Sequence, residues 1–157
     1  MDPVTVCLWF DMNAEAAVEL YQQIFDNVTV HEIARYGEGG PAPAGTALTI
    51  DVTIEGQRLT FLNGGPEFPL SAAVSLVVRC DSQDEVDRYY DALLAAGGEE
   101  QQCGWVSDRF GLCWQIVPKR LPELLGSSDP GVGERVMAAM LQMKKLDIAA
   151  LEAAARG

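Results

Sequence analysis

The sequence predicts an α+β fold in which two βαβββ modules are followed by a helical C-terminal extension. The first observation is an internal repeat, because a shift of 68 positions aligns Leu8 with Leu76 and Tyr21 with Tyr89. The second is that each copy opens with a β-rich run, continues as an amphipathic helix and ends in further strands. We expect one domain over residues 1–157, made of module one (1–70), module two (71–118) and the extension (119–157).

Module one begins with a predicted strand over residues 4–11, which are rich in β-branched and aromatic side chains. Asn13 stands where a helix would be capped, and Glu15 follows in its first turn. Helical spacing then places five apolar side chains on one face: Ala17, Leu20, Tyr21, Ile24 and Phe25. Further strands are predicted over residues 28–36, 46–55 and 58–63.

Module two repeats this order. A strand is predicted over residues 72–80, and Ser82 with Glu85 has the spacing of a capping box. The helix that follows has a predicted buried face of Val86, Tyr89, Tyr90, Leu93 and Leu94. Gly97 and Gly98 then provide a C-terminal cap.

Residues 102–118 predict a hairpin that ends module two. Asp108 and Gly111 occupy the first and last positions of a type I turn. After the turn, strand alternation puts Leu112, Trp114 and Ile116 on one face, and Cys113, Gln115 and Val117 on the other. Gln115 is the strongly polar member of this set, so we expect it to have a hydrogen-bond partner.

The extension predicts a short helical turn over residues 121–126 and two longer helices. Pro130 opens the first, whose apolar face is Val132, Val136, Met140 and Met143. Asp147 caps the last helix. Met137, Met140 and Met143 have the spacing of core residues, and a surface that covers a partner subunit is the alternative.

The charge of the chain excludes several classes of partner. It carries 23 acidic and 11 basic residues, a net charge of -12. Nucleic acid or an anionic membrane surface would require a basic patch, and the longest basic run is Lys144-Lys145. No apolar run approaches the roughly 18 residues of a membrane span.

The cysteines predict a reducing compartment. Cys7, Cys80, Cys103 and Cys113 show no CxxC spacing, and His31 is the single histidine. The N-terminus lacks the basic and apolar regions of a signal peptide. We therefore expect a cytoplasmic protein with reduced thiols.

Several blocks of sequence resemble one family: residues 8–11, 61–68, 102–105, 108–118, 136–137 and 140–145. They are similar to the PhnB-like branch of the vicinal oxygen chelate superfamily (glyoxalase, bleomycin resistance and dioxygenase proteins). That branch is also catalogued as 3-demethylubiquinone-9 3-methyltransferase-like. The resemblance implies that the modules curl into a glyoxalase-like half-barrel cup with the ligand on its concave side. It also implies a homodimer, because relatives often complete their cups across subunits.

Metal enzymes of the superfamily hold their ion with His, Gln or Glu on the first and last strands of each half. In this chain the corresponding first-strand positions fall on Val6 and Val74, or on Cys7 and Ser75 after a one-residue slip. The last-strand position falls on Gln115, and Asn63 is the nearest polar residue in the first half. This set has too few donors for a metal ion, so we expect no metal and no cofactor.

The methyltransferase description receives no support from the sequence. A methyltransferase of the usual kind holds its nucleoside cofactor with a glycine-rich loop between a strand and a helix. The two predicted strand-to-helix junctions, residues 11–13 and 80–82, contain no glycine.

The predicted function is binding of a small molecule, unidentified by the sequence, in a cavity lined by Asn63, Gln115, Trp9, Trp105 and Trp114. For Gln115 the alternative is a hydrogen bond across the sheet, and for the tryptophans it is an interface between the half-barrels. Two other functions stay open: a metal-dependent lyase, isomerase or dioxygenase, and a drug-sequestering resistance protein. No residue is assigned a catalytic role.

Overall fold

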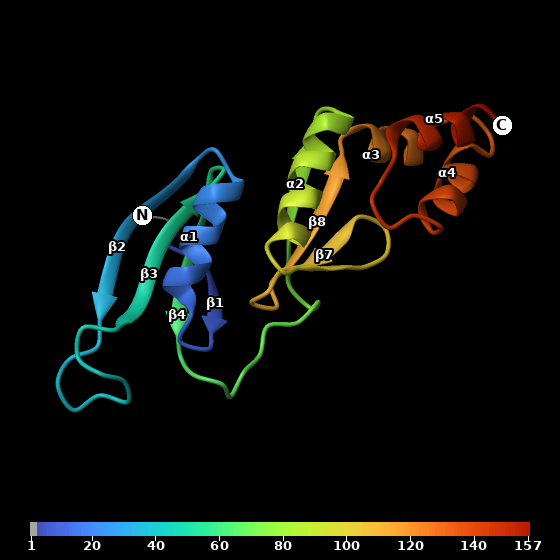
Figure 1. Ribbon diagram of the computed structural model, residues 1–157. Helices are drawn as coiled ribbons and strands as arrows, with labels where there is room; N and C mark the ends of the chain where they lie inside the picture. Colours follow the sequence, from blue (N-terminus) through green and yellow to red (C-terminus); the bar gives the residue numbers. More distant parts are fainter. Residues whose placement is uncertain (1–2) are drawn as a thin grey trace. The chain divides into compact units, whose positions relative to one another are not determined.

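A computed structural model describes residues 3–157, which confirm the α+β fold (Figure 1). They form two compact units that divide between Leu70 and Ser71, the position at which the sequence repeat divides. The second unit contains module two and the extension. That the modules and the extension act as a single domain stays a prediction.

Module one is a four-stranded sheet with one helix. Its elements are β1 (Val6–Phe10), α1 (Ala14–Ile24), β2 (Val28–Arg35), β3 (Ala47–Ile54) and β4 (Gln57–Asn63). The strands lie in the order β1-β4-β3-β2, with β1 parallel to β4 and the other pairs antiparallel (Figure 1). The first strand is therefore an edge strand that pairs with the last.

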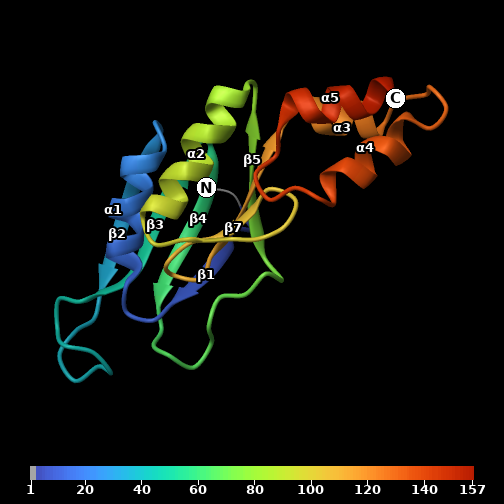
Figure 2. The same cartoon turned by 45° about the vertical axis from the view of Figure 1, so that its right-hand side comes forward.

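Module two has the same topology, which confirms the duplication. Its elements are β5 (Ser75–Cys80), α2 (Gln83–Ala95), β6 (Glu99–Glu100), β7 (Trp105–Ser107) and β8 (Cys113–Pro118). The order is β5-β8-β7-β6, again with the first strand parallel to the last. Strands β5 and β7 and helix α2 of this module are labelled in Figure 2. The predicted strand over 72–80 starts three residues later, at Ser75.

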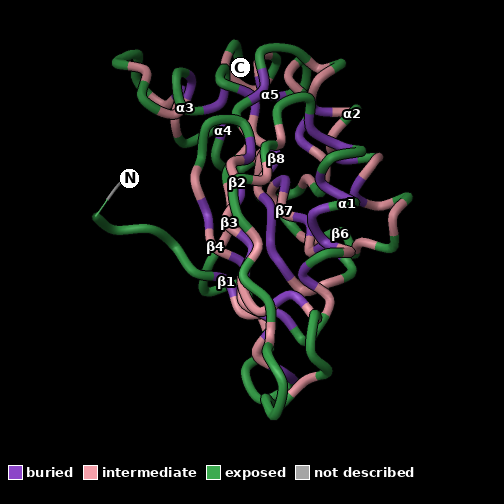
Figure 3. Tube along the Cα trace, turned by 90° about the vertical axis from the view of Figure 1, so that its left-hand side faces the viewer, coloured by how far each residue is buried: buried purple, intermediate pink, exposed green. Residues whose placement is uncertain are grey.

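Each module packs its helix against one face of its sheet. In module one α1 contacts β3 and β4, and all five apolar residues predicted for its inner face are buried. In module two α2 contacts β5, β7 and β8, with Val86, Tyr90 and Leu93 buried. Figure 3 shows buried and exposed segments alternating along both helices. The opposite face of each sheet is called its open face below.

The caps of the two helices differ. Ser82 Oγ accepts a hydrogen bond from the backbone N–H of Glu85, as a capping box predicts, while the Glu85 carboxylate accepts from the N–H of Asp81. Asn13 occupies the N-cap position of α1, but its side chain does not cap the helix. Asn63, from the end of β4, does so instead: its Oδ1 accepts from the N–H of Ala14 at 2.9 Å.

The predicted turn between β7 and β8 is present, and a buried carboxylate organises it. The N–H of Gly111 donates to the carbonyl oxygen of Asp108 at 3.0 Å. The Asp108 side chain accepts from the N–H groups of Phe110 and Leu112 through Oδ1, and from Trp114 Nε1 through Oδ2 at 3.0 Å. Because Asp108 is only 5% exposed, these bonds offset the desolvation of its charge.

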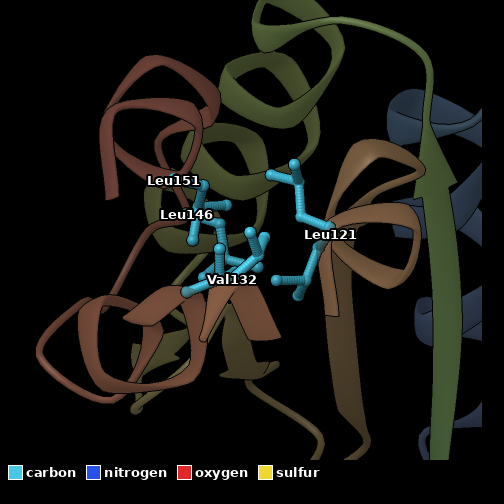
Figure 4. Packing of buried hydrophobic residues seen from close by; sticks show 6 residues of the cluster. Leu121, Val132, Leu146 and Leu151 are labelled. Carbon is cyan, nitrogen blue, oxygen red and sulfur yellow. The ribbon is translucent and has the colours of Figure 1, made fainter. Parts of the chain in front are cut away.

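The extension consists of α3 (Arg120–Leu125), α4 (Val132–Met140) and α5 (Ile148–Arg156). Its core is a cluster of aliphatic side chains that point toward one another (Figure 4): Leu121, Leu124, Val132, Val136, Leu146 and Leu151. Met140 and Met143 pack against this cluster, whereas Met137 is 42% exposed. Met140 and Met143 are therefore half-buried against the core of the extension, whereas Met137 is not.

Residues before α5 attach the extension to module two. The N–H of Gly104 donates to the carbonyl oxygen of Lys144 at 2.7 Å, and Gln83 Nε2 donates to that of Leu146 at 3.0 Å. Lys145 pairs with Asp87 and Asp91 on α2.

Across residues 3–157, the helices are all too short or too polar to cross a lipid bilayer.

Candidate functional site

The open face of module two carries Gln115 at its centre. Gln115 has Val77 as its neighbour on β5 and Trp105 as its neighbour on β7, and paired residues of adjacent strands share a face. Trp114 and Ile116, one residue to either side, point toward α2 and are buried. We define the Gln115 face as Ser75, Val77, Arg79, Trp105 and Gln115.

Of the two polar atoms of the Gln115 amide, only the nitrogen has a hydrogen-bond partner within residues 3–157. Its Nε2 donates to Ser75 Oγ at 2.9 Å. Within residues 3–157 no donor lies in hydrogen-bond contact with its Oε1. The side chain is half-buried and its Oε1 is accessible to water, which a donor group of a ligand would replace. The polar group at the centre of this face is therefore available to a ligand.

The surroundings of Gln115 are mostly apolar. Val77 is 43% exposed, and Trp105 is half-buried on the other side of Gln115. Val117, at the end of β8, packs against the aliphatic cluster of the extension. An aromatic ring and branched aliphatic groups around one amide are the composition typical of a small-molecule site.

Trp9 lies on the open face of module one and is held by its own module. Its Nε1 donates to the carbonyl oxygen of Gly65 at 2.8 Å. Its ring packs edge-on against the ring of Phe68, with 5.0 Å between the two ring centroids. A Cβ on Gly64 would lie 2.3 Å from the indole ring, so glycine is required at this position. Gly64 thus makes room for Trp9.

Asn63 lies in the core of module one, beneath α1. It is 1% exposed, and its Nδ2 donates to the carbonyl oxygen of Ala47 at 3.0 Å while its Oδ1 caps the helix. Trp114 is likewise 2% exposed, with its indole N–H bonded to Asp108. We leave both residues out of the proposed binding surface, because packing and hydrogen bonds within their own modules already account for them.

The remaining part of the open face of module one is polar. Arg58 hydrogen-bonds Asp51 through both Nε and Nη2, and this bond lowers the pKa of the Asp51 carboxyl. His31 Nε2 and Thr53 Oγ1 lie 2.7 Å apart on the neighbouring strands. These groups satisfy one another, in contrast to the half-satisfied amide of Gln115.

Two of the four thiols, those of Cys80 and Cys113, are buried, while Cys103 is half-buried and Cys7 is exposed. Burial raises the pKa of Cys80 to about 11, and burial followed by the charge of Asp108 raises that of Cys113. Cys103 Sγ lies 3.7 Å from the carbonyl oxygen of Met140, and the Cys103 N–H donates to Met143. Raised pKa values keep Cys80 and Cys113 protonated at neutral pH and poor as nucleophiles.

The donors present do not fit a resident divalent metal. Strand alternation places Cys7 and Ser75, rather than Val6 and Val74, on the open faces. Ser75 is occupied by Gln115, and an amide with a hydroxyl is a weak donor set without His or carboxylate. No group of three His, Cys, Asp or Glu side chains suited to a metal ion occurs in residues 3–157.

A hollow of about 500 Å³ lies in the extension, away from the predicted site residues. It is open and mostly polar, and its walls include Arg120, Asp129 and Arg156. Arg120 is paired there with Glu123 and Glu152. Arg120 is therefore neutralised in this hollow, whereas Arg156 and Asp129 have no ion pair within residues 3–157.

Comparison with known proteins relates the chain to one family. Residues 2–117 match the family described as 3-demethylubiquinone-9 3-methyltransferase. A putative 3-demethylubiquinone-9 3-methyltransferase, PhnB protein, from Bacillus cereus is 29% identical, with a TM-score of 0.67 over 74% of this chain and 99% of that one. The comparison with curated proteins gives no match.

More distant structures share the fold. Protein PA1353 from Pseudomonas aeruginosa is 24% identical, with a TM-score of 0.57 over 73% of this chain and 95% of that one. The fosfomycin resistance protein FosX from Listeria monocytogenes, in complex with Mn(II) and a dihydroxypropylphosphonic acid, is 15% identical. Its TM-score is 0.51 over 73% of this chain and 88% of that one.

The duplicated βαβββ topology and these likenesses define an α+β protein with a glyoxalase-like fold. Among proteins of this fold, the chain belongs to the PhnB-like family described as 3-demethylubiquinone-9 3-methyltransferase. The match ends at residue 117, so the C-terminal extension lies outside it.

Asn63→Ala should destabilise module one by about 3 kcal/mol, because it leaves the N–H of Ala14 and the carbonyl of Ala47 buried without their partner. Urea unfolding followed by circular dichroism measures the loss. Gln57→Ala, at the exposed start of the same strand, is the control and should change stability by less than about 0.5 kcal/mol. A loss no larger than that of the control, together with weakened ligand binding, would restore a ligand role for Asn63.

Proposed function

We propose that this protein binds a small molecule on the Gln115 face, without a resident catalytic metal. The observation that carries the proposal is the Gln115 amide, held at one end by Ser75 and open at the other, between Val77 and Trp105. That Trp9, on the open face of module one, contacts a ligand stays a separate prediction. The ligand is expected to present a hydrogen-bond donor to Gln115 Oε1 and an apolar body to the neighbouring side chains.

On this surface the apolar side chains and the Gln115 amide contribute to binding in different ways. Apolar contacts with Trp105 and Val77 supply most of the free energy of binding, since they remove ligand and protein surface from water. The amide supplies orientation, because its bond to Ser75 restricts rotation of the side chain and fixes the direction of Oε1. A ligand that lacks a group for this oxygen leaves it unsatisfied and binds less tightly.

Methyl transfer from a nucleoside cofactor is not part of the proposal. Residues 11–13 and 81–82, between each first strand and its helix, contain no glycine. Both helix N-termini are also occupied, that of α1 by Asn63 and that of α2 by Ser82. A cofactor phosphate or carboxylate group would have to displace these caps to reach the same N–H groups.

Gln115→Leu tests the proposal with two named probes, 1-naphthoate and 1-naphthamide, in the presence of EDTA. The substitution should weaken binding of 1-naphthamide, which carries an N–H donor, about tenfold by removing the hydrogen-bond acceptor. Stability should change by less than about 1 kcal/mol, because the position is half-buried and leucine fits an apolar surface. Isothermal titration calorimetry measures binding, and urea unfolding measures stability.

Gln142→Leu is the matched control, since Gln142 is exposed in the extension of the same unit. It should leave both probes unaffected. Failure of both probes to bind at millimolar concentration, or equal affinities for Gln115→Leu and wild type, contradicts the proposal. Binding that disappears with EDTA would favour a metal-dependent enzyme instead.

We also propose that the protein is a homodimer. The support is that β1 and β5, like β2 and β6, are edge strands, each bonded to a neighbour strand on one side only. Val6 on β1 is an apolar residue that is 44% exposed. Edge strands with exposed apolar side chains are usually covered in stable proteins, and a second copy of the chain supplies that cover.

Sedimentation velocity should therefore give twice the mass of one chain at micromolar concentration. Val6→Lys should shift the protein toward the monomer, because a charge on an edge strand opposes association. Leu141→Lys places the same charge at a site that is 55% exposed in the extension, and it should leave the dimer intact. A monomer at all concentrations in the wild-type protein contradicts the proposal.

A further inference from the structure

The basic side chains of this acidic protein are almost all engaged. Of the 11 Lys and Arg residues, nine have an ion pair, a side-chain hydrogen bond or a ring contact: Arg35, Arg58, Arg88, Arg109, Lys119, Arg120, Arg135, Lys144 and Lys145. Arg79 and Arg156 make no such contact with residues 3–157. With 23 acidic residues available, an arginine without a partner is unexpected.

Arg79 belongs to the Gln115 face. Its neighbour on β8 is Val117, and it lies two residues beyond Val77 on the same side of β5. Two residues of a strand span about 7 Å, so the Cα of Arg79 lies roughly that far from the row that contains Gln115. The side chain is exposed and can reach over this distance.

Among the strand residues of this sheet, the acidic residue that the pairings place on the side of Arg79 is Glu99, and it is remote from Arg79; Asp81, just beyond β5, pairs with Lys119. Glu99 on β6 is the neighbour of Ser107, which in turn is the neighbour of Cys113. Three strand spacings separate β5 from β6, about 14 Å across the sheet, and Glu99 lies at the opposite end of the face. The cation of Arg79 is therefore not neutralised on the surface where Gln115 and Trp105 lie.

We propose that the ligand of the Gln115 face is an organic acid with an apolar or aromatic body. Its anionic group pairs with the Arg79 guanidinium, its body lies on Val77 and Trp105, and a polar substituent reaches Gln115. The spacing of about 7 Å between the Arg79 and Gln115 rows fits a molecule of the size of a fused two-ring compound. This inference rests on the proposed function and adds the charge of the ligand to it.

The net charge of the protein makes such a local cation necessary. A chain with a charge of -12 repels anions at long range, so an anionic ligand is bound only where a cation outweighs that field. The guanidinium group provides two parallel N–H donors for a carboxylate, which strengthens and orients the pair. On this face the apolar residues would also lower the local dielectric constant around it.

The test compares 1-naphthoate with 1-naphthamide, which have the same rings and differ in charge. Wild-type protein should bind the anion about tenfold more tightly, and about 0.5 M NaCl should reduce that preference by screening the pair. Arg79→Gln should abolish the preference by weakening 1-naphthoate binding and leaving 1-naphthamide binding unchanged. Arg79→Lys should restore part of it. Calorimetric titration gives all of these affinities.

Arg88→Gln is the matched control, because it removes the same charge from the exposed side of α2. It should keep the wild-type preference for the anion. Equal affinities of the wild-type protein for the two probes, or a preference for 1-naphthoate that survives Arg79→Gln, overturns the inference. In either case, 1-naphthamide binding that still depends on Gln115 leaves the proposed function standing. Loss of Gln115-dependent binding for both probes overturns the function and the inference together.

Discussion

Strand β8 runs between β5 and β7, and the alternation of its side chains is the constraint on which module two depends. Trp114 and Ile116 point toward α2 and form the core, while Gln115 points to the open face. A slip of one residue would bury the amide and expose the indole. The bond from Trp114 Nε1 to Asp108 opposes such a slip, because the same carboxylate also fixes the turn before β8. One aspartate thereby sets the direction of Gln115.

In module one, too, a buried polar side chain at the end of a strand organises its surroundings, but the residues differ. Asn63 ends β4 and points toward α1, where it caps the helix and bonds Ala47. Gly64, the next residue, has no side chain, so the Trp9 indole can lie against the backbone there. Duplication has preserved the topology of the two sheets, whereas the polar group at the core, an asparagine in one module and an aspartate in the other, differs.

Much of the fold was predictable from local pattern. The repeat predicted the same succession of a strand, a helix and further strands in both modules, and the buried face of α1 followed from spacing alone. The roles of Asn63 and Trp114 depend on contacts with Ala14 and Asp108, and the first of these spans 49 residues. Strand alternation did place Trp114 and Gln115 on opposite faces, a signal that argues against grouping them in one cavity. The absence of an ion-pair partner for Arg79 within residues 3–157 could not be predicted from the sequence, because the pairing of charged side chains is decided by tertiary structure.

The central claim is that a ligand contacts the Gln115 face. Two-dimensional ¹H–¹⁵N spectroscopy tests it directly, because the three indole N–H groups and the glutamine side-chain amides give separate signals. Titration with 1-naphthoate should move the signals of the Trp105 indole, the Gln115 amide and the backbone of β5, and leave the Trp114 indole in place. Shifts confined to the hollow of the extension, near Arg120 and Arg156, would contradict the account.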